Sequence, residues 1–249
     1  MFTTRRIITS GGDVYRDEYS LTFDGTDDYI TCGSDSSIDD IWAGGGTCAG
    51  WINVASLGEV FGNVINKVNW AIHPLTLSGG ACKFKLFTVR DGTDGQWQTD
   101  NQIITIDKWH HFAITYDSDS ASNDPIIYID GVSVAITEIS GAPSSDYTSD
   151  ASGTLLIGNN AATTRTYDGK ISEIALWDTI LSANQVKTLY NSKEPFDARN
   201  VALSNLQGYW RMGDGLEGGS GTTIYDMSDN ANNGTLTNHT GVYSGDTPR

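Results

Sequence analysis

Apolar and polar residues alternate in short segments along most of the chain, and turn-forming residues separate these segments. In LTFDGTDDYI, for example, Leu21 and Phe23 alternate with polar residues, and Asp24-Gly25 supplies a tight reversal. A period of two places successive side chains on opposite faces of an extended strand. The same pattern predicts further strands at 47–54, 60–67, 70–77, 83–89, 102–106, 154–159 and 167–179.

The clearest strand pair lies in residues 108–118 and 125–134. Asp130-Gly131, inside the second segment, suits the positive φ angles of a tight hairpin turn. The alternation assigns Phe112, Ile114 and Tyr116 to one face of the first segment, and Trp109, His111 and Ala113 to the other.

One segment carries a convincing helix signal. Ser182 and Gln185 have the spacing of a capping box, and Leu181 and Val186 occupy the two staple positions that accompany it. Asn191 suits the end of a helix. The sequence therefore predicts one short helix between Ser182 and Asn191.

Composition favours an all-β domain. The chain has 249 residues, and its 7 Trp, 11 Tyr and 7 Phe provide enough bulk to fill the core of a sandwich. Small polar residues dominate the remainder, and helix-forming Lys, Glu and Leu are scarce. We expect a two-sheet antiparallel β-sandwich with one short helix, formed as a single domain by residues 17–249.

Residues 1–16 differ from the rest of the chain in charge. They contain Arg5, Arg6 and Arg16 against a single acidic residue, Asp13. This segment is expected to be an N-terminal arm that docks on a partner, and a frayed terminus is the alternative.

The formal net charge of −16 argues against nucleic acid and anionic membranes as partners, because like charges repel across most of the surface. The first residues lack the apolar core of a signal peptide, and no later stretch is apolar enough to span a bilayer. Cys32, Cys48 and Cys82 are too few and too scattered for a disulfide scaffold or a C-x-x-C site, so we expect buried free thiols.

The stretch from Gly208 to Leu236 joins an aromatic, strand-like opening to a loop rich in oxygen donors. Hard cations such as calcium take six to eight oxygen ligands. Candidate ligands in this loop are Asp226, Asp229, Asn230 and Asn233, together with Ser228 and Asn232. The alternative is an Asx-rich turn whose side chains bond to its own backbone.

Six motifs cover roughly residues 19–190: LTFDGTDDYITCG, CAGWINV, WHHFAITYD, IYIDG, LLIGN and YDGKISEIALWDTILSANQVKTLYN. They resemble, in order, the laminin-G-like jelly rolls of the concanavalin A-like lectin and glucanase superfamily, and a match of six ordered motifs is more specific than any one of them. The resemblance implies a two-sheet antiparallel sandwich with one short helix near its end.

Residues 207–236 are similar to the stretch that normally opens such a domain, but here they close the chain. Either this displaced first strand fills its place within its own chain, or it is donated to a neighbouring subunit, which would make an obligate oligomer. The rearranged motif also resembles arrangements in bacteriophage structural proteins. The family's corresponding loop is often a calcium site, and the resemblance adds Glu173 and Asp24 or Asp28 as remote ligands.

Catalytic signatures are missing. Glucanases of this superfamily place carboxylates on one strand at a period of two, with the acid and the nucleophile about 5–9 Å apart, and no E-x-D-x-E-like run occurs here. His110 and His111 have no nearby nucleophile and are expected to be structural. We therefore expect no enzymatic activity, although a glycan hydrolase or lyase with residues from distant strands remains a lesser alternative.

Trp97 and Tyr147 are the candidate glycan-binding residues, because sugars stack on exposed aromatic rings and both residues are expected in polar loops. The function predicted from the sequence is that of a non-catalytic structural or adhesion protein on a virion surface. Its partners would be other virion proteins and a cell-surface glycan, in a homo-oligomer or a larger assembly. The alternative is a calcium-dependent carbohydrate-binding module of bacterial origin.

Overall fold

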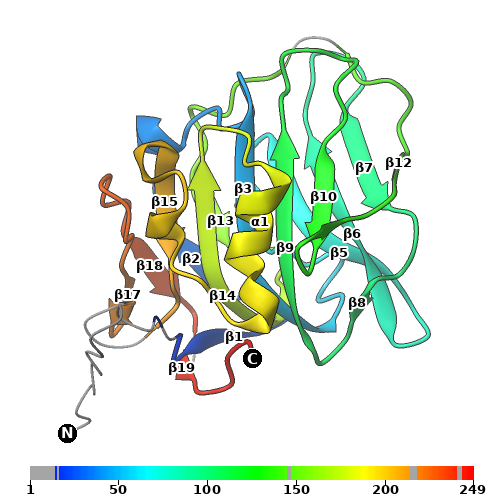
Figure 1. The fold of residues 1–249 in the computed structure, drawn as a ribbon. Coiled ribbons are helices and arrows are strands. Elements are labelled where there is room, and N and C mark those ends of the chain that lie inside the picture. Colours follow the sequence, from blue (N-terminus) through cyan, green and yellow to red (C-terminus); the bar gives the residue numbers. More distant parts are fainter. Residues whose placement is uncertain (1–14, 16, 145–146, 214–217, 240–242) are drawn as a thin grey trace, which may run out of the picture.

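The computed structural model describes residues 15, 17–144, 147–213, 218–239 and 243–249. Two antiparallel sheets lie face to face and form a sandwich with one short α-helix among these residues, which confirms the predicted fold class (Figure 1). Of the predicted N-terminal arm, only Tyr15 lies within the described residues.

The first sheet contains, in spatial order, β11 (Val132–Ser133), β10 (Ile126–Ile129), β9 (Trp109–Tyr116), β3 (Gly46–Ser56), β14 (Asp168–Trp177), β1 (Ser20–Asp24) and β19 (Tyr243–Ser244), with β15 (Leu206–Trp210) also on β14. The second contains β12 (Ile136–Glu138), β7 (Gly95–Thr99), β6 (Ala81–Thr88), β5 (Trp70–Ser78), β4 (Ile65–Lys67), β13 (Leu155–Ile157), β2 (Tyr29–Thr31), β18 (Gly234–Thr237), β17 (Thr223–Ile224) and β16 (Gly219–Ser220), with β8 (Ile104–Thr105) on β6.

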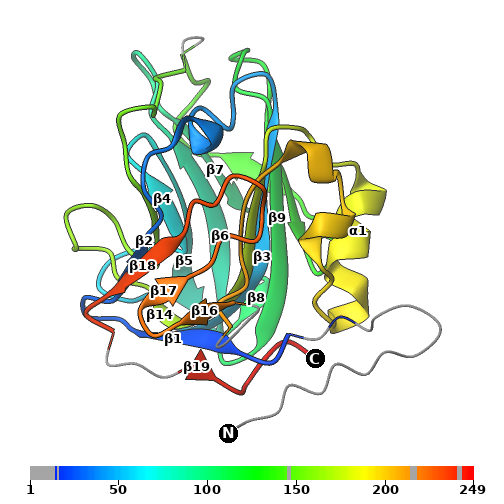
Figure 2. The same ribbon diagram turned by 90° about the vertical axis from the view of Figure 1, so that its left-hand side faces the viewer.

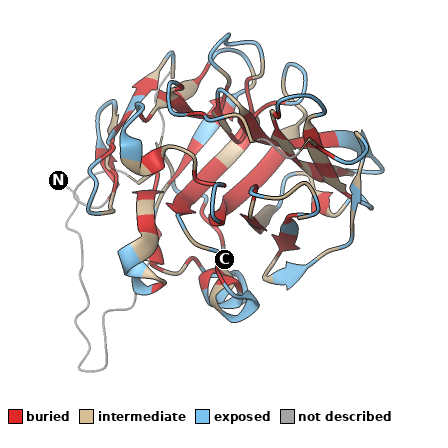
Figure 3. Cartoon of the chain, turned by 90° about the horizontal axis from the view of Figure 1, so that it is seen from above, coloured by how far each residue is buried: buried red, intermediate tan, exposed pale blue. Residues whose placement is uncertain are grey.

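The main apolar core fills the space between the sheets, where the strands are buried (Figure 3). On β9, Phe112, Ile114 and Tyr116 point into this core, and Ala113 belongs to a second apolar cluster on the other face. The period of two in the sequence therefore assigned both faces of this strand correctly. Asp130 and Gly131 adopt φ values of 52° and 75°, as the predicted turn requires.

The helix α1 (Ala183–Tyr190) has both hydrogen bonds of the predicted capping box, between Ser182 and Gln185, and Asn191 ends it in the left-handed region. Val186 and Leu189 belong to the second apolar cluster, so α1 covers the outer face of the first sheet (Figure 2). In the described part of the chain, four 3-10 turns complete the helical elements: Ser36–Ile38, Asn191–Lys193, Ala198–Asn200 and Leu203–Asn205.

The two ends of the chain meet at β14. β1 pairs with the first half of β14, and β15 pairs with the second half on the same side. In the second sheet, β18 pairs with β2 (Figure 2). The segment 207–236 therefore pairs within its own chain in both sheets.

Two predicted strands are much shorter than expected. The segment 60–67 becomes a strand only at Ile65, and the segment 102–106 forms only β8. Phe61 has a φ of 56°, which a strand does not allow. The three cysteines are buried free thiols, as predicted. None of the helices in the described part of the chain is both long and apolar enough to cross a membrane.

Candidate functional site

The predicted calcium loop holds its main carboxylate in a dense set of hydrogen bonds. Asp226 is buried, and its carboxylate accepts bonds from the backbone N–H groups of Tyr209 (2.8 Å), Ser228 (2.9 Å) and Asn232 (2.8 Å). The Asp226 N–H donates to Oδ1 of Asn233 at 3.0 Å. These bonds are those of an Asx-rich turn that satisfies its own backbone, the alternative stated for this loop.

The other predicted ligands of this loop are arranged differently. Asp229 and Asn230 are exposed, and Nδ2 of Asn230 donates to the backbone oxygen of Gln207 at 3.1 Å. Glu173 does not join them, because it bonds to the hydroxyl of Tyr209 whereas Asp226 bonds to the backbone nitrogen of that residue. The length of the tyrosine side chain therefore separates the two carboxylates.

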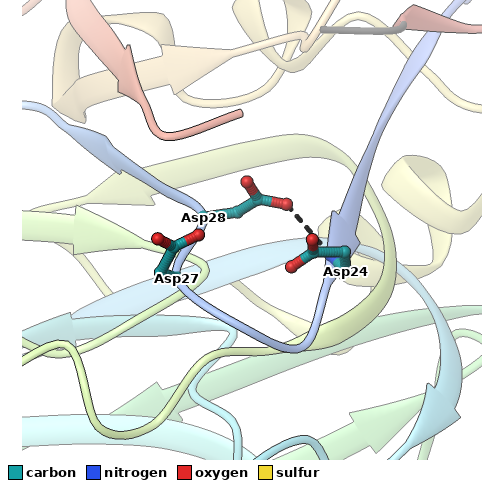
Figure 4. A group of neighbouring side chains, drawn as sticks. All are labelled: Asp24, Asp27 and Asp28. Atoms are coloured by element: carbon teal, nitrogen blue, oxygen red, sulfur yellow. Dashed lines mark hydrogen bonds between the residues drawn. The ribbon is translucent and has the colours of Figure 1, made fainter. Parts of the chain in front are cut away.

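Asp24 lies in a third place. Its carboxylate and those of Asp27 and Asp28 have oxygens within 4.8 Å of one another at the turn between β1 and β2 (Figure 4). Asp28 is buried and accepts a bond from the Asp24 N–H at 3.0 Å, while Asp24 accepts one from Thr26 at 2.9 Å. Burial raises the pKa of Asp28, and the negative charges of its two neighbours add to the effect.

This turn and the Asp226 loop lie at opposite ends of β18, since Thr237 pairs with Tyr29 at one end and Thr235 with Thr31 at the other. The predicted ligand set of the calcium site is thus divided among three places. Calcium binding by any one of them stays a prediction.

Trp97 cannot be the predicted glycan-stacking residue, because its side chain is 0% exposed. It lies in β7, where its ring packs against Tyr116 with the centroids 5.0 Å apart and its indole N–H donates to Asp124 at 2.8 Å. Gln96 and Gln98 flank it, and this alternation was the signal that Trp97 points inward.

Tyr147 is half-buried. Its hydroxyl donates to Oδ2 of Asp150 at 2.9 Å, and the guanidinium of Arg90 lies 5.6 Å from the centre of its ring. A contact between Tyr147 and a sugar stays a prediction.

The histidines of β9 have structural surroundings. His110 bonds to Asp130 at 2.9 Å, and its other ring nitrogen accepts the N–H of Thr105 at 3.1 Å. His111 is buried against the rings of Trp51 and Tyr190, and burial lowers its pKa to about 3, so it is neutral. These contacts agree with the structural role expected for both.

A buried polar cluster joins both ends of the chain at the outer face of β14, and the sequence did not reveal it. Glu173 accepts hydrogen bonds from the hydroxyls of Tyr15 and Tyr209, whose oxygens lie 2.8 Å apart. The Nε of Arg211 lies 3.5 Å from the Glu173 carboxylate, and its guanidinium lies 4.3 Å from the centre of the Tyr15 ring. Asp17 accepts the hydroxyl of Ser172 at 2.6 Å. No sequence motif could reveal a cluster whose members are so far apart in the chain.

The backbone explains why Glu173 reaches this position. The register of β14 shifts between Ser172 and Ala175, and Glu173 has a φ of 58°. Ile171 and Ile174 both point into the main core, so the bulge reverses the alternation between them and leaves Glu173 on the opposite face.

The cluster has fewer positive charges than carboxylates. Burial raises the pKa of Glu173, and Arg211 opposes this rise. Burial and the nearby Glu173 raise the pKa of Asp17 to about 8. With one guanidinium for two buried carboxylates, one of the two carboxyl groups retains its proton near neutral pH.

The geometry of the cluster does not resemble a pair of glycosidase carboxylates, which share one space around a sugar. A hollow of about 230 Å³ beside the cluster is bordered by Asp17 and not by Glu173. Both carboxylate oxygens of Glu173 accept hydrogen bonds from the hydroxyls of Tyr15 and Tyr209. The residues that line the hollow are Tyr15, Asp17, Glu18, Glu194, Pro195, Pro248 and Arg249.

The outer face of the second sheet offers a more accessible polar surface. β6 and β7 are neighbours, and their inward residues alternate with half-buried outward ones. α1 lies on the far side of the molecule, and among the described residues no α-helix lies on this face (Figure 2). The outward residues are Lys83, Lys85 and Phe87 on β6, and Gln96 and Gln98 on β7.

Asp226→Ala should lower the free energy of unfolding by about 2–4 kcal/mol, because it leaves buried N–H groups of Tyr209 and Asn232 without an acceptor. Urea denaturation measures this loss. Asp229→Ala is the matched control in the same loop and should change stability by less than about 0.5 kcal/mol. If the loop only satisfies its own backbone, the loss is equal in calcium and in EDTA. If calcium instead stabilises the wild type and stabilises neither Asp226→Ala nor Asp229→Ala, the loop is a metal site.

The contribution of Asp17 to stability should fall as the pH rises from about 4 to about 8. Over this window folded Asp17 holds a proton that the unfolded chain has already released, so this contribution to the free energy of unfolding falls with rising pH. The buried His73 and His111 act in the opposite sense up to about pH 6.5, and they do so equally in the wild type and in Asp17→Asn. Asp17→Asn should therefore have a more positive slope of stability against pH than the wild type and should be more stable than the wild type at pH 9. Urea denaturation at pH 5, 7 and 9 tests this, with Asp229→Asn as the control, and an unchanged slope in Asp17→Asn would contradict it.

Comparisons with known proteins agree with this architecture. Residues 24–187 match the Laminin_G_3 family, described as the concanavalin A-like lectin/glucanases superfamily. Among curated proteins, none matches the sequence. A provisionally assigned carbohydrate binding protein of Bacteroides ovatus ATCC 8483 has a similar structure, with a TM-score of 0.62 and 19% identity, and the alignment covers 95% of this chain and 62% of that one.

The heptameric SAP-like pentraxin of Limulus polyphemus is also similar, with a TM-score of 0.52 and 15% identity over 71% of this chain and 83% of that one. Identities this low show a shared fold and leave the ligand open. The family match spans more than half of the chain. This protein therefore belongs to the Laminin_G_3 family of the concanavalin A-like lectin/glucanases superfamily.

Proposed function

We propose that this protein is a non-catalytic recognition domain that binds a glycan on the outer face of its second sheet. The observation that carries the proposal is the accessible polar face formed by β6 and β7. Lys83, Lys85, Gln96 and Gln98 present side-chain donors there at the spacing of neighbouring strands. Such groups can hydrogen-bond to sugar hydroxyls without rearrangement of the backbone.

The family and the fold support the same conclusion. The fold is that of lectin-like domains, and one structural relative is named for carbohydrate binding. The proposal includes the absence of catalysis. The buried carboxylates of Asp17 and Glu173 do not border one accessible space, and the hydroxyls of Tyr15 and Tyr209 donate to both oxygens of Glu173.

The purified protein should bind at least one glycan on an array of neutral and acidic glycans, and it should leave that glycan intact. Binding is measured on the array, and cleavage by the appearance of reducing ends and of unsaturated sugars in solution. A protein that binds none of the glycans would contradict the recognition function. Release of products, lost on heat denaturation, would contradict the absence of catalysis.

We also propose that the domain is displayed on a virion, where residues 1–16 attach it to other virion proteins. The basic charge of these residues against the acidic remainder supports this assignment, since opposite charges favour docking. Purified particles should contain the protein at a fixed stoichiometry, measured by mass spectrometry. Its absence from washed particles would contradict the virion role and leave glycan recognition untouched.

A further inference from the structure

The loop between β3 and β4 holds an exposed aromatic ring in an unusual backbone conformation. Phe61 is 39% exposed and has a φ of 56°. A bulky residue in the left-handed region costs free energy, and such residues persist where the surrounding structure enforces them, often at binding sites. Phe61 adopts this unfavourable conformation although its ring remains partly exposed to solvent.

The surroundings of Phe61 fix the loop firmly. A Cβ on Gly58 or Gly62 would lie 2.0 or 2.4 Å from the carbonyl oxygen of Thr166, so the two backbones approach as closely as glycine allows. The N–H of Asn63 donates to the carbonyl of Arg165 at 2.8 Å. The position of the Phe61 ring is therefore largely set before any ligand arrives.

Two further side chains complete the surroundings of the ring. The centroid of Phe61 lies 5.5 Å from that of His73 on β5. The guanidinium of Arg165 lies 5.7 Å from the centre of the Phe61 ring, and it donates to the carbonyl of Val60 at 2.8 Å. The ring thus lies next to a cation and next to His73 of an interior strand of the second sheet.

A second cation lies on the same face. Lys85 is the cross-strand partner of His73, and its ammonium donates to Oε1 of Gln96 at 2.6 Å. Burial lowers the pKa of Lys85, and the positive charge of Arg165 lowers it further. Burial lowers the pKa of His73 to about 4, so this ring adds no charge.

Among the described residues, neither cation has an acidic partner. Within the part of the chain that the structure describes, neither Lys85 nor Arg165 has a carboxylate within 4.0 Å. The nearby Glu59 is engaged by the N–H and hydroxyl of Thr166. On a chain with 31 acidic and 15 basic residues, two cations near His73 without a counter-charge among the described residues are unexpected, and they offer a binding place for an anion.

We propose that Arg165 and Lys85, together with Phe61, form a subsite for an acidic glycan. The two cations bind the carboxylate or sulfate group of one sugar residue, and the exposed part of the Phe61 ring contacts the sugar's C–H groups. Gln96 and Gln98 lie on the same face and bind neighbouring hydroxyls. This inference rests on the proposed glycan recognition and names the class of ligand and the residues that select it.

Native gels that contain dextran, dextran sulfate or polygalacturonate provide the test, because retardation in each gel gives an affinity. The protein should bind dextran sulfate or polygalacturonate and not dextran, and added salt should weaken binding. The acidic polymer that binds more tightly distinguishes a sulfate from a carboxylate ligand. Single-stranded DNA serves as a competitor. It is a polyanion like the two acidic polysaccharides, but it does not present sugar hydroxyls at the positions where they do.

Arg165→Gln and Lys85→Gln should each weaken binding by about tenfold, the usual effect of losing one hydrogen bond to a charged group. Phe61→Leu should weaken it by a smaller factor. Lys187→Gln, which removes the same charge from the exposed surface of α1, is the control and should bind as the wild type does. Thermal melting of each variant checks that it is folded, and Arg165→Lys, which retains the charge, should bind with intermediate affinity.

Each contrary result has a distinct meaning. No binding to either acidic polymer, unchanged affinity in the folded Arg165→Gln and Lys85→Gln variants, or equally tight binding of DNA would overturn the subsite. Glycan recognition itself would still stand if the protein bound glycans on the array. An array without any bound glycan would instead contradict the proposed function.

Discussion

The fold depends on the requirement that the edge of β14 be paired along its whole length. An unpaired strand edge exposes a row of N–H and C=O groups, which favours aggregation. Two strands from opposite ends of the chain meet this requirement here, β1 along the first half of β14 and β15 along the second. The sandwich is therefore complete only when both chain ends are in place, and β18 beside β2 repeats this arrangement in the second sheet.

The junction between β1 and β15 also explains the buried polar cluster. The bulge in β14 lies where one partner strand ends and the other begins, and it turns Glu173 to the outer face. Tyr15 from one chain end and Tyr209 from the other then share this carboxylate. Because Asp17 is buried beside it with a raised pKa, closure of the sandwich is coupled to the uptake of a proton.

The two outer faces of the sandwich differ in what covers them. α1 and the segment after it cover the first sheet with a second apolar cluster. The second sheet instead presents lysines and glutamines beside the Phe61 loop, and that loop is held by close backbone contact with Thr166. A covered face stabilises the fold, whereas an accessible polar face with a fixed aromatic ring is suited to recognition.

The sequence by itself determined the features that depend on neighbours along the chain: the faces of β9, the Asp130-Gly131 turn and the capping box of α1. The alternation of Gln96, Trp97 and Gln98 also indicated that Trp97 points inward. Only the tertiary structure decided which distant side chains meet. Glu173 reaches Tyr15 and Tyr209 through a bulge, and Phe61 reaches Arg165 through two glycines packed on another segment. Strand pairing and register between remote segments set these contacts, and the periodicity of one segment carries no information about its partner.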